Sequence, residues 1–406
     1  MGRSFTSFVV AAMLWPVEAA DELSARFSPP DVRPPVRISA HVAEPAKANA
    51  KGTASDVQPA RRWVPIAPKQ TPPPEAQETR GTGLPERLSQ TGLFSVGDGA
   101  RQVIDPSHLR FAPQYPLWSD GAVKRRWLHL PEGSRIDGSD PDVWKFPVGT
   151  KFWKEFRFGD RVVETRLIQR FEDGWRAGAY VWNAEGTDAR LAPEGLKDAH
   201  AITADVSHDV PSMADCRSCH EAIPSFILGF SALQLSPDRD PGAPNAERRG
   251  EDFVDLRVIA DRGLLAGFPP QRLEPPPRVI AGSDVERRAL GYLHANCGNC
   301  HNGRGPLSRL GLNLWQDVSV PKRVVAPAVR TTIGKQGDWR LPGEERDAVR
   351  VVPGVPERSS VFVRMASREP LVQMPPLATQ RVDREGVAAV SAWIRELAKQ
   401  DERRER

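Results

Sequence analysis

The stretch Ser283–His301, SDVERRALGYLHANCGNCH, decides how the C-terminal part of the chain folds. Ser283 is a typical helix N-cap, and Glu286 stands three residues after it, where it completes a capping box. The apolar residues that follow recur at helical spacing: Val285, Ala289, Leu290 and Leu293. The pattern predicts a helix that leads directly into the motif Cys297-Gly298-Asn299-Cys300-His301.

The same pattern occurs earlier as Cys216-Arg217-Ser218-Cys219-His220, and the two copies use all 4 cysteines of the chain. Two thiols three positions apart can bond the two vinyl groups of one porphyrin while the next imidazole coordinates its iron. Histidine makes up only 8 of 406 residues, so its presence after both pairs is improbable by chance. We therefore predict two covalently bound haem c groups, each with its iron on a histidine. Their predicted ligands are Cys216, Cys219 and His220, and Cys297, Cys300 and His301.

Three other roles are possible for the cysteines: a zinc site, a redox-active pair and disulfides. A zinc site with four thiolate ligands would account for both Cys-x-x-Cys pairs, but it would leave both histidines unexplained. A thioredoxin-like redox pair would need a βαβ context, which the residues around Cys297 do not indicate. Disulfides are permitted if the chain is exported.

The C-terminal unit, residues 283–400, resembles class I cytochrome c. In that family an N-terminal helix with a glycine and an aromatic residue, here Gly291 and Tyr292, crosses a C-terminal helix with an aromatic residue, here Trp393. A second helix is indicated near the C-terminus by apolar residues at helical spacing: Val387, Val390, Ile394 and Leu397. The resemblance implies that Gly291 lets the two helix backbones approach each other.

The resemblance also implies roles for Pro306 and Met374. The Pro306 carbonyl would accept the N–H of the His301 imidazole, and Met374 would be the sixth ligand of the second iron. Met365 is the alternative ligand, although its helical surroundings favour core packing. His/Met ligation fills both axial positions and favours electron transfer over catalysis. The segment Trp315–Ser359 is an insertion relative to the minimal family pattern, and it could cover or expose the haem edge.

The sixth ligand of the first haem is less evident. Met213 lies just before the first motif, where it is poorly placed to reach the far face of a haem, and no methionine follows the motif until Met365. His200 and His208 are the candidate distal ligands. An open sixth position is the alternative, and an open iron could bind small molecules and make the protein an enzyme.

Residues 85–236 are predicted to form a β-rich domain that ends in the first motif. The sequence has a period of two residues from Phe152 to Phe158, which is typical of a β-strand. Turns between strands are expected at Glu132-Gly133, Gly159-Asp160 and Asp173-Gly174. Six tryptophans fall in this part and are expected in its core: Trp118, Trp127, Trp144, Trp153, Trp175 and Trp182. The predicted class is α+β: an antiparallel, β-sandwich-like haem domain followed by a mostly helical cytochrome c domain.

The β-rich part resembles the cytochrome P460 and c'-beta group, in which a β-sandwich ends in the same motif. In P460 proteins a lysine is cross-linked to the haem, and the resemblance implies Lys151 or Lys154 as its counterpart. As a whole, the chain resembles bacterial exported di-haem c-type cytochromes that carry a Leu117–Ala122 stretch, LWSDGA, and a Pro353–Pro376 stretch.

Residues outside these domains have simple predicted roles. Residues 1–20 combine a positive start, an apolar core and small residues near Ala19, which is typical of a secretory signal peptide and indicates a periplasmic location. Residues 21–84 and 237–282 are rich in proline and are expected to be a disordered tether and a connector. Residues 401–406 form a charged tail, and no transmembrane segment is expected in the mature chain.

The charge balance argues against nucleic acid as a partner, because 56 basic and 52 acidic residues are interleaved along the chain. We predict electron transfer between redox partner proteins. The alternative is a haem oxidoreductase with an open catalytic first haem, P460-like or peroxidase-like, and a second haem that relays electrons. Basic residues near the second motif could steer an acidic partner: Arg304, Arg309, Lys322 and Arg323.

Overall fold

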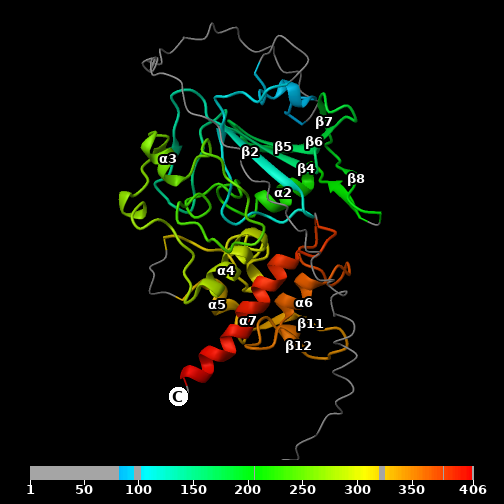
Figure 1. The fold of residues 1–406 in the computed structure, drawn as a ribbon, viewed down its shortest axis with the longest axis vertical. Helices are drawn as coiled ribbons and strands as arrows, with labels where there is room; N and C mark the ends of the chain where they lie inside the picture. The colour runs from blue at the N-terminus through cyan, green and yellow to red at the C-terminus, as the bar shows by residue number, and fades with distance from the viewer. Residues whose placement is uncertain (1–81, 96–101, 205, 320–324, 378, 405–406) are drawn as a thin grey trace, which may run out of the picture. The chain divides into compact units, whose positions relative to one another are not determined.

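A computed structural model describes residues 82–95, 102–204, 206–319, 325–377 and 379–404, which belong to the unit Gln70–Arg406 (Figure 1). The predicted signal peptide and nearly all of the predicted tether lie outside the described residues. None of the helices described is both long enough and apolar enough to cross a membrane.

An antiparallel sheet of six strands, in the order β1-β2-β4-β5-β6-β7, forms the centre of the N-terminal part (Figure 1). Its strands are β1 (Leu109–Arg110), β2 (Val123–His129), β4 (Lys151–Phe158), β5 (Arg161–Phe171), β6 (Gly174–Trp182) and β7 (Ala189–Leu191). Two expected hairpins are confirmed, since Gly159-Asp160 joins β4 to β5 and Asp173 lies in the turn before β6. Glu132-Gly133 is also a turn, but the expected hairpin there is wrong, because the strand that follows it pairs in parallel with residues 265–266. Gly159 has φ +55°, a conformation that glycine adopts without steric cost.

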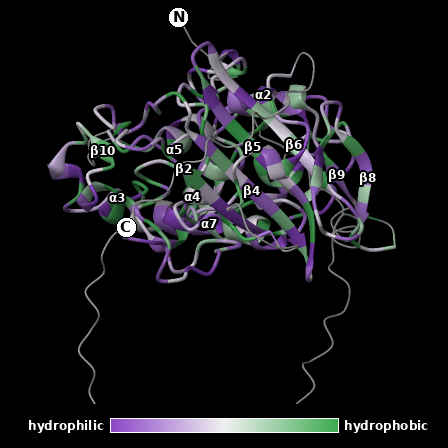
Figure 2. Ribbon diagram, turned by 90° about the horizontal axis from the view of Figure 1, so that it is seen from above, coloured by the Kyte–Doolittle hydropathy of each residue, from purple (hydrophilic) through white to green (hydrophobic). Residues whose placement is uncertain are grey.

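The two faces of this sheet differ in character. Trp153 lies on one face in an apolar cluster with Trp127, and Phe152 lies on the other face in the main core. Charged residues are interspersed with apolar ones, and Figure 2 shows hydrophilic and hydrophobic bands along β4 and β5. Of the six tryptophans, three are buried and three are half-buried; the buried ones are Trp127, Trp144 and Trp153.

Smaller elements surround the sheet. The short strands form pairs: β3 (Ile136–Asp137) with β10 (Leu265–Ala266), β8 (Leu196–Ala201) with β9 (Ser207–Val210), and β11 (Gln336–Arg340) with β12 (Asp347–Val349). The 3-10 helices are η1 (Leu88–Gln90), η2 (Pro270–Arg272), η3 (Ser308–Leu310) and η4 (Pro356–Arg358). Residues 237–282 contain helix α3 (Leu256–Asp261) as well as β10, so this proline-rich segment contributes a strand that pairs with the β-rich part.

The C-terminal part is helical. Its helices are α4 (Asp284–Asn296), α5 (Pro327–Thr332), α6 (Ser360–Ala366) and α7 (Arg384–Arg404). The predicted start of α4 is confirmed, because the Ser283 hydroxyl accepts the N–H of Glu286 at 3.0 Å. The expected C-terminal helix is also present, and it continues beyond residue 400 into the segment that was expected to be a charged tail.

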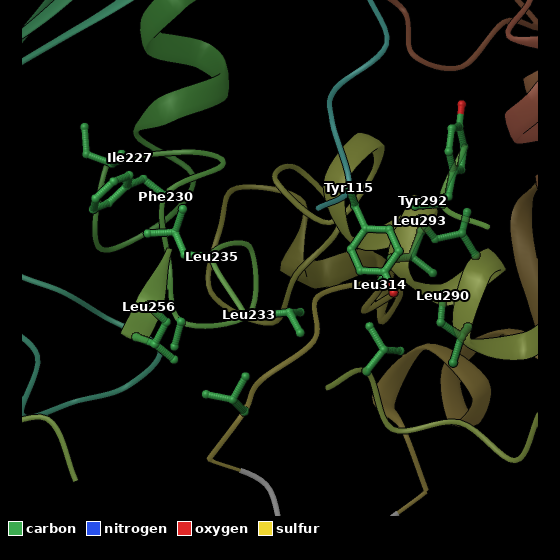
Figure 3. Packing of buried hydrophobic residues seen from close by; sticks show 14 of the residues in the cluster. Tyr115, Ile227, Phe230, Leu233, Leu235, Leu256, Leu290, Tyr292, Leu293 and Leu314 are labelled. Atoms are coloured by element: carbon green, nitrogen blue, oxygen red, sulfur yellow. The ribbon is translucent and has the colours of Figure 1, made fainter. Parts of the chain in front are cut away.

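Gly291 has a different neighbour from the one that the family resemblance implied. A Cβ built on Gly291 would lie 2.2 Å from the ring of Tyr115, which comes from the β-rich part. Figure 3 shows Tyr115 among leucines of α4 and the loop that follows it. Gly386 of α7 instead makes room for the partner helix, since its Cβ would lie 2.1 Å from the ring of Tyr292. The expected close approach between α4 and α7 therefore depends on Gly386, and Gly291 lets the two parts of the chain interlock.

The described fold is mixed α+β, with separate helices and with sheets that are antiparallel except for the parallel pair of β3 and β10. One buried cluster extends from Phe111 in the β-rich part to Leu397 in α7. Tyr115 belongs to it and donates its hydroxyl to the carboxylate of Asp240 at 3.3 Å. The two motif-bearing parts therefore share one hydrophobic core.

Candidate functional site

Helix α2 (Met213–His220) carries the first motif. Ser212 begins the helix: its hydroxyl accepts the N–H of Asp215 at 3.1 Å, and the Asp215 carboxylate accepts the N–H of Ser212 at 3.0 Å. The two cysteines and the histidine of the motif stand at positions i, i+3 and i+4, which share one face of an α-helix. The two thiols and the imidazole consequently face the same side.

The His220 imidazole is held in one orientation. Its Nδ1 lies 2.6 Å from the carbonyl of Phe226, and because a carbonyl only accepts, Nδ1 carries the proton. Burial lowers the pKa of His220 to about 4, so the ring is neutral at pH 7. Nε2 therefore has a free lone pair, and a neutral histidine with its proton on Nδ1 can coordinate a metal through Nε2.

The second motif begins where α4 ends. The N–H groups of Cys300 and His301 both donate to the carbonyl of Cys297, at 3.1 and 2.8 Å, and this tight turn brings the motif together. Burial lowers the pKa of His301, so this imidazole is also neutral at pH 7. Its Nδ1 is buried and has no hydrogen-bond partner among the described residues. The bond to the Pro306 carbonyl that the family resemblance implies is therefore not formed in this structure.

The two motifs lie against each other although 76 residues separate them. Cys219 of the first motif and Cys300 of the second lie close enough to affect each other's ionisation, and the neighbouring Cys300 thiol lowers the pKa of Cys219. The Asn302 amide donates to the carbonyl of Ala222 at 3.3 Å, so the loops that follow the motifs are also joined. None of the four cysteines forms a disulfide. Burial raises the pKa of Cys216 to about 11.

Each motif lines its own cavity. The first cavity, of about 150 Å³, is lined by the cysteines and histidine of the first motif. The second, of about 380 Å³, is lined by those of the second motif and lies within the usual range of ligand pockets, about 300–1,000 Å³. The first cavity is smaller, so its walls would have to part further to admit a porphyrin. Five residues line both cavities: Leu117, Arg166, Cys219, Asn299 and Leu377.

Two methionines line the second cavity. Met374 lies in the loop after α6, where its N–H donates to the carbonyl of Arg364 at 2.9 Å, and it is half-buried. Met365 lies on α6, is 5% exposed and belongs to the main core. Both side chains therefore share a cavity with His301.

If the second motif holds a haem, Met374→Ala is expected to convert its iron from low spin to high spin, because the thioether would be the sixth ligand. The visible and electron paramagnetic resonance spectra of the oxidised protein measure this change. Met365→Ala is the matched control, and it should lower stability by about 3 kcal/mol through loss of core packing while leaving the spin state unchanged. High spin in the Met365 variant and low spin in the Met374 variant would reverse the assignment.

The insertion Trp315–Ser359 forms one wall of the second cavity. Gly337, Asp338 and Trp339 of β11 line it, together with Arg350 after β12. Arg350 donates to the carbonyls of Gly311 and Thr331 at 3.0 and 2.8 Å, which fastens this hairpin to the loop that follows the second motif. The described part of the insertion therefore covers one side of the cavity.

The LWSDGA stretch joins the β-rich part to the Met374 loop. Asp120, 3% exposed, accepts the backbone N–H groups of Gln380 and Arg381 at 3.0 and 2.8 Å. Trp118 donates its ring N–H to the carbonyl of Arg381 at 3.0 Å, and its backbone N–H to the side chain of Asn296 at 2.7 Å. These bonds hold the loop after Met374 and the residue before the second motif in one arrangement.

The residues that were considered as distal ligands of the first haem lie elsewhere. His200 stacks on Phe158, and Met213 packs in the apolar cluster of Trp153. His208 lines the second cavity, and its Nε2 is held by the carboxylate of Glu164 at 2.8 Å. None of these three side chains lines the first cavity.

His294 was missed by the sequence reasoning and does line the first cavity. Its Nδ1 accepts the backbone N–H of Gln316 at 3.1 Å, and burial lowers its pKa to about 4. The neutral ring must then carry its proton on Nε2. His294 is therefore arranged as a hydrogen-bond donor rather than as a ligand of iron. Its place in the α4 pattern just before the second motif was the only signal in the sequence.

Of the two lysines implied by the P460 resemblance, only Lys154 lines the first cavity. Lys151 lies on the opposite face of the sheet and donates to the carbonyl of Thr91 at 2.7 Å. The signal for Lys154 was its place in the alternating Phe152–Phe158 pattern, where it shares a face with phenylalanines.

Glu164 is a further buried charge that the sequence reasoning did not identify. It is fully buried and accepts Nε of Arg166 at 2.5 Å and Nη2 at 3.1 Å, in addition to His208. Burial favours the neutral acid, but Arg166 and His208 outweigh it and lower the pKa of Glu164. Because Arg166 lines both cavities, Glu164 positions a cation between the two motifs.

The basic residues considered for partner steering are only partly described. Arg304 is exposed and lies 4.0 Å from Asp317, and Arg309 is exposed. Lys322 and Arg323 lie outside the described residues.

Comparison with family models, with curated proteins and with solved structures finds no match for this chain. Within the described residues, no three His, Cys, Asp or Glu side chains gather as they would around a bare metal ion. The four cysteines are therefore not arranged as a four-thiolate zinc site.

The residues of both motifs fit a haem c group. The thiols are free, the imidazoles are neutral, and Nε2 of His220 has a free lone pair. His301 has a buried and unpartnered Nδ1, and it shares its cavity with a thioether. The donor set of the second cavity, imidazole and thioether, is one that haem iron accepts.

Proposed function

We propose that this protein is an exported di-haem c-type cytochrome that transfers electrons between redox partners. Cys216, Cys219 and His220 would hold the first haem, and the corresponding residues of the second motif would hold the second. Haem iron, when bound, would supply one-electron redox chemistry. The periplasm is the proposed location, because the predicted signal peptide directs export and because haem c is attached outside the cytoplasm.

The observation that carries this proposal is the contact between the two motifs. Cys219 and Cys300 are the second cysteines of their motifs; they line the second cavity together, and their thiols shift each other's pKa. If each of these two cysteines were bonded to a porphyrin, the edges of the two porphyrins would lie next to each other. The residues that line both cavities would then exclude water from the space between the two groups. This arrangement supports electron transfer from one centre to the other.

The packing of α4 against α7 supports the class I cytochrome c arrangement proposed for residues 283–400. Tyr292 and Gly386 meet where the two helices contact each other. Trp393 of α7 is fully buried in the same core. We further propose that the six-stranded sheet with α2 on it is the β-sandwich-like haem domain.

Mass spectrometry with visible spectroscopy tests the proposal. The mature chain, produced in a host that attaches haem c, is expected to exceed its polypeptide mass by two haem groups and to show a Soret band. A colourless protein of bare polypeptide mass would overturn the proposal.

A catalytic first haem is the alternative, and one observation favours it. Among the described residues, no methionine lines the first cavity, and His294 presents an N–H there. The first iron would then lack a sixth protein ligand. Carbon monoxide is expected to bind the reduced protein at one haem if this is so, with a shifted Soret band of half the total amplitude. If neither haem binds carbon monoxide, the catalytic alternative is wrong and the protein would act only as an electron carrier.

A further inference from the structure

Three basic side chains lie next to one another across the sheet, in the wall of the first cavity. Arg126 of β2 pairs with Lys154 of β4, and Lys154 pairs with Arg166 of β5. All three line the first cavity. Like charges directly opposite each other on one face of a sheet repel, so this row needs negative charge beside it.

Two members of the row have a carboxylate partner. Arg126 forms a bidentate pair with Glu247, in which Nη2 lies 3.0 Å from Oε1, and Arg166 forms a bidentate pair with Glu164. For Lys154, in contrast, no hydrogen bond or ion pair is formed within the described part of the chain. Its ammonium group lies 4.8 Å from the centre of the Phe156 ring.

The charge around Lys154 is unbalanced. A fourth cation, Lys124, is 9% exposed and donates to the carbonyl of Leu117 at 2.9 Å, but it has no carboxylate within ion-pair distance among the described residues. The carboxylate of Asp383 also acts on Lys124, but of the described carboxylates only those of Glu164 and Glu247 form ion pairs with members of the row. Asp215 also lines the cavity, but its carboxylate accepts the N–H that begins α2. Burial, together with the neighbouring cations, holds the pKa of Lys154 well below its usual range.

We propose that Lys154, flanked by Arg126 and Arg166, is the centre of a carboxylate-binding site within the first cavity. A carboxylate there would supply the missing negative charge and would accept short, charge-assisted hydrogen bonds. It has two possible sources: a propionate of the first haem, which rests on the proposed function, or a small free carboxylate that enters the cavity. The volume of about 150 Å³ suits only a small free carboxylate.

The test compares the haem-loaded wild-type protein with Lys154→Met. Lys145→Met is the control, because Lys145 is 74% exposed and loses the same charge outside the cavity. Lys154→Gln is the second variant, in case methionine disturbs packing. Sodium formate is added at constant ionic strength, and the Soret band and the thermal midpoint are followed. The midpoint potentials of both haems are measured in its absence.

A free carboxylate site predicts saturable formate binding by the wild type and Lys145→Met, weakened at least tenfold in both Lys154 variants. A site filled by a propionate predicts no formate binding, together with a lower potential of the first haem in the Lys154 variants alone. Lys154 variants that match the wild type in both measurements would overturn the proposal. So would a change of the first haem from low to high spin, because Lys154 would then be an iron ligand. A colourless wild type whose thermal midpoint still rises with formate through Lys154 would keep this site and overturn only the haem proposal.

Discussion

Glu164→Gln is expected to lower the free energy of unfolding by about 3 kcal/mol, because it breaks a buried ion pair and leaves Arg166 without its carboxylate. Glu164 is fully buried, and its bonds to Arg166 and His208 account for its lowered pKa. Urea denaturation of the wild type and the variant measures the difference.

The loss of stability caused by Glu164→Gln should become smaller as the pH is lowered. An acid with a lowered pKa in the folded state contributes stability above its ordinary value of 4.5, and that stability is lost as the pH falls through the lowered folded-state pKa. The difference in the free energy of unfolding between wild type and variant is therefore expected to have its full size at pH 7 and to become smaller below about pH 4.5.

Glu155→Gln is a matched control on the neighbouring strand. Glu155 is 7% exposed, but burial raises its pKa, which means that the folded state disfavours its ionised form. Neutralising it is expected to change stability by less than about 1 kcal/mol. Equal losses in the two glutamine variants would contradict the role given to Glu164.

The double variant Cys297→Ala/Cys300→Ala is expected to retain one haem instead of two. The thiols of the second motif would be absent, while Cys216 and Cys219 would still attach the first group. The measurements are the mass of the mature chain and its Soret absorbance, which should fall by one haem and by about half. The midpoint potential of the remaining haem should also shift, because the two cavities share part of their lining.

The reciprocal variant, Cys216→Ala/Cys219→Ala, serves as the control. It should lose the other haem and keep the low-spin spectrum that is expected if Met374 ligates the second iron. A full complement of two haems in either double variant would contradict the assignment of one motif to each group.

Much of the local structure was predictable from neighbouring residues. The N-cap at Ser283, the helical spacing after it and the Gly159-Asp160 turn depend on contacts within a few residues, and the structure has the expected elements there. The antiparallel sheet and the mixed α+β class followed from the same local patterns. The position of Met374 in the cavity of His301 was also anticipated, through the family resemblance.

The candidate site itself was predictable only in part. The spacing of cysteine and histidine was enough to identify the two motifs. The sequence did not predict which residues contact Gly291, Asp120 and Lys154. Each of these residues meets a partner that is distant in the chain or that comes from another strand. Local sequence patterns carry little information on such pairs, because the partners come together only when the elements pack.

What the order of residues alone determined is the composition of each motif: two thiols and an imidazole, at a spacing that predicts the attachment of one porphyrin. Only the tertiary structure placed Cys219 beside Cys300 and set the Arg126–Lys154–Arg166 row in a cavity wall. The physical reason is that the spacing within a motif is a property of one helical turn. The distance between motifs, and the charge that faces a cavity, depend on how the sheet and the helices bury a common core.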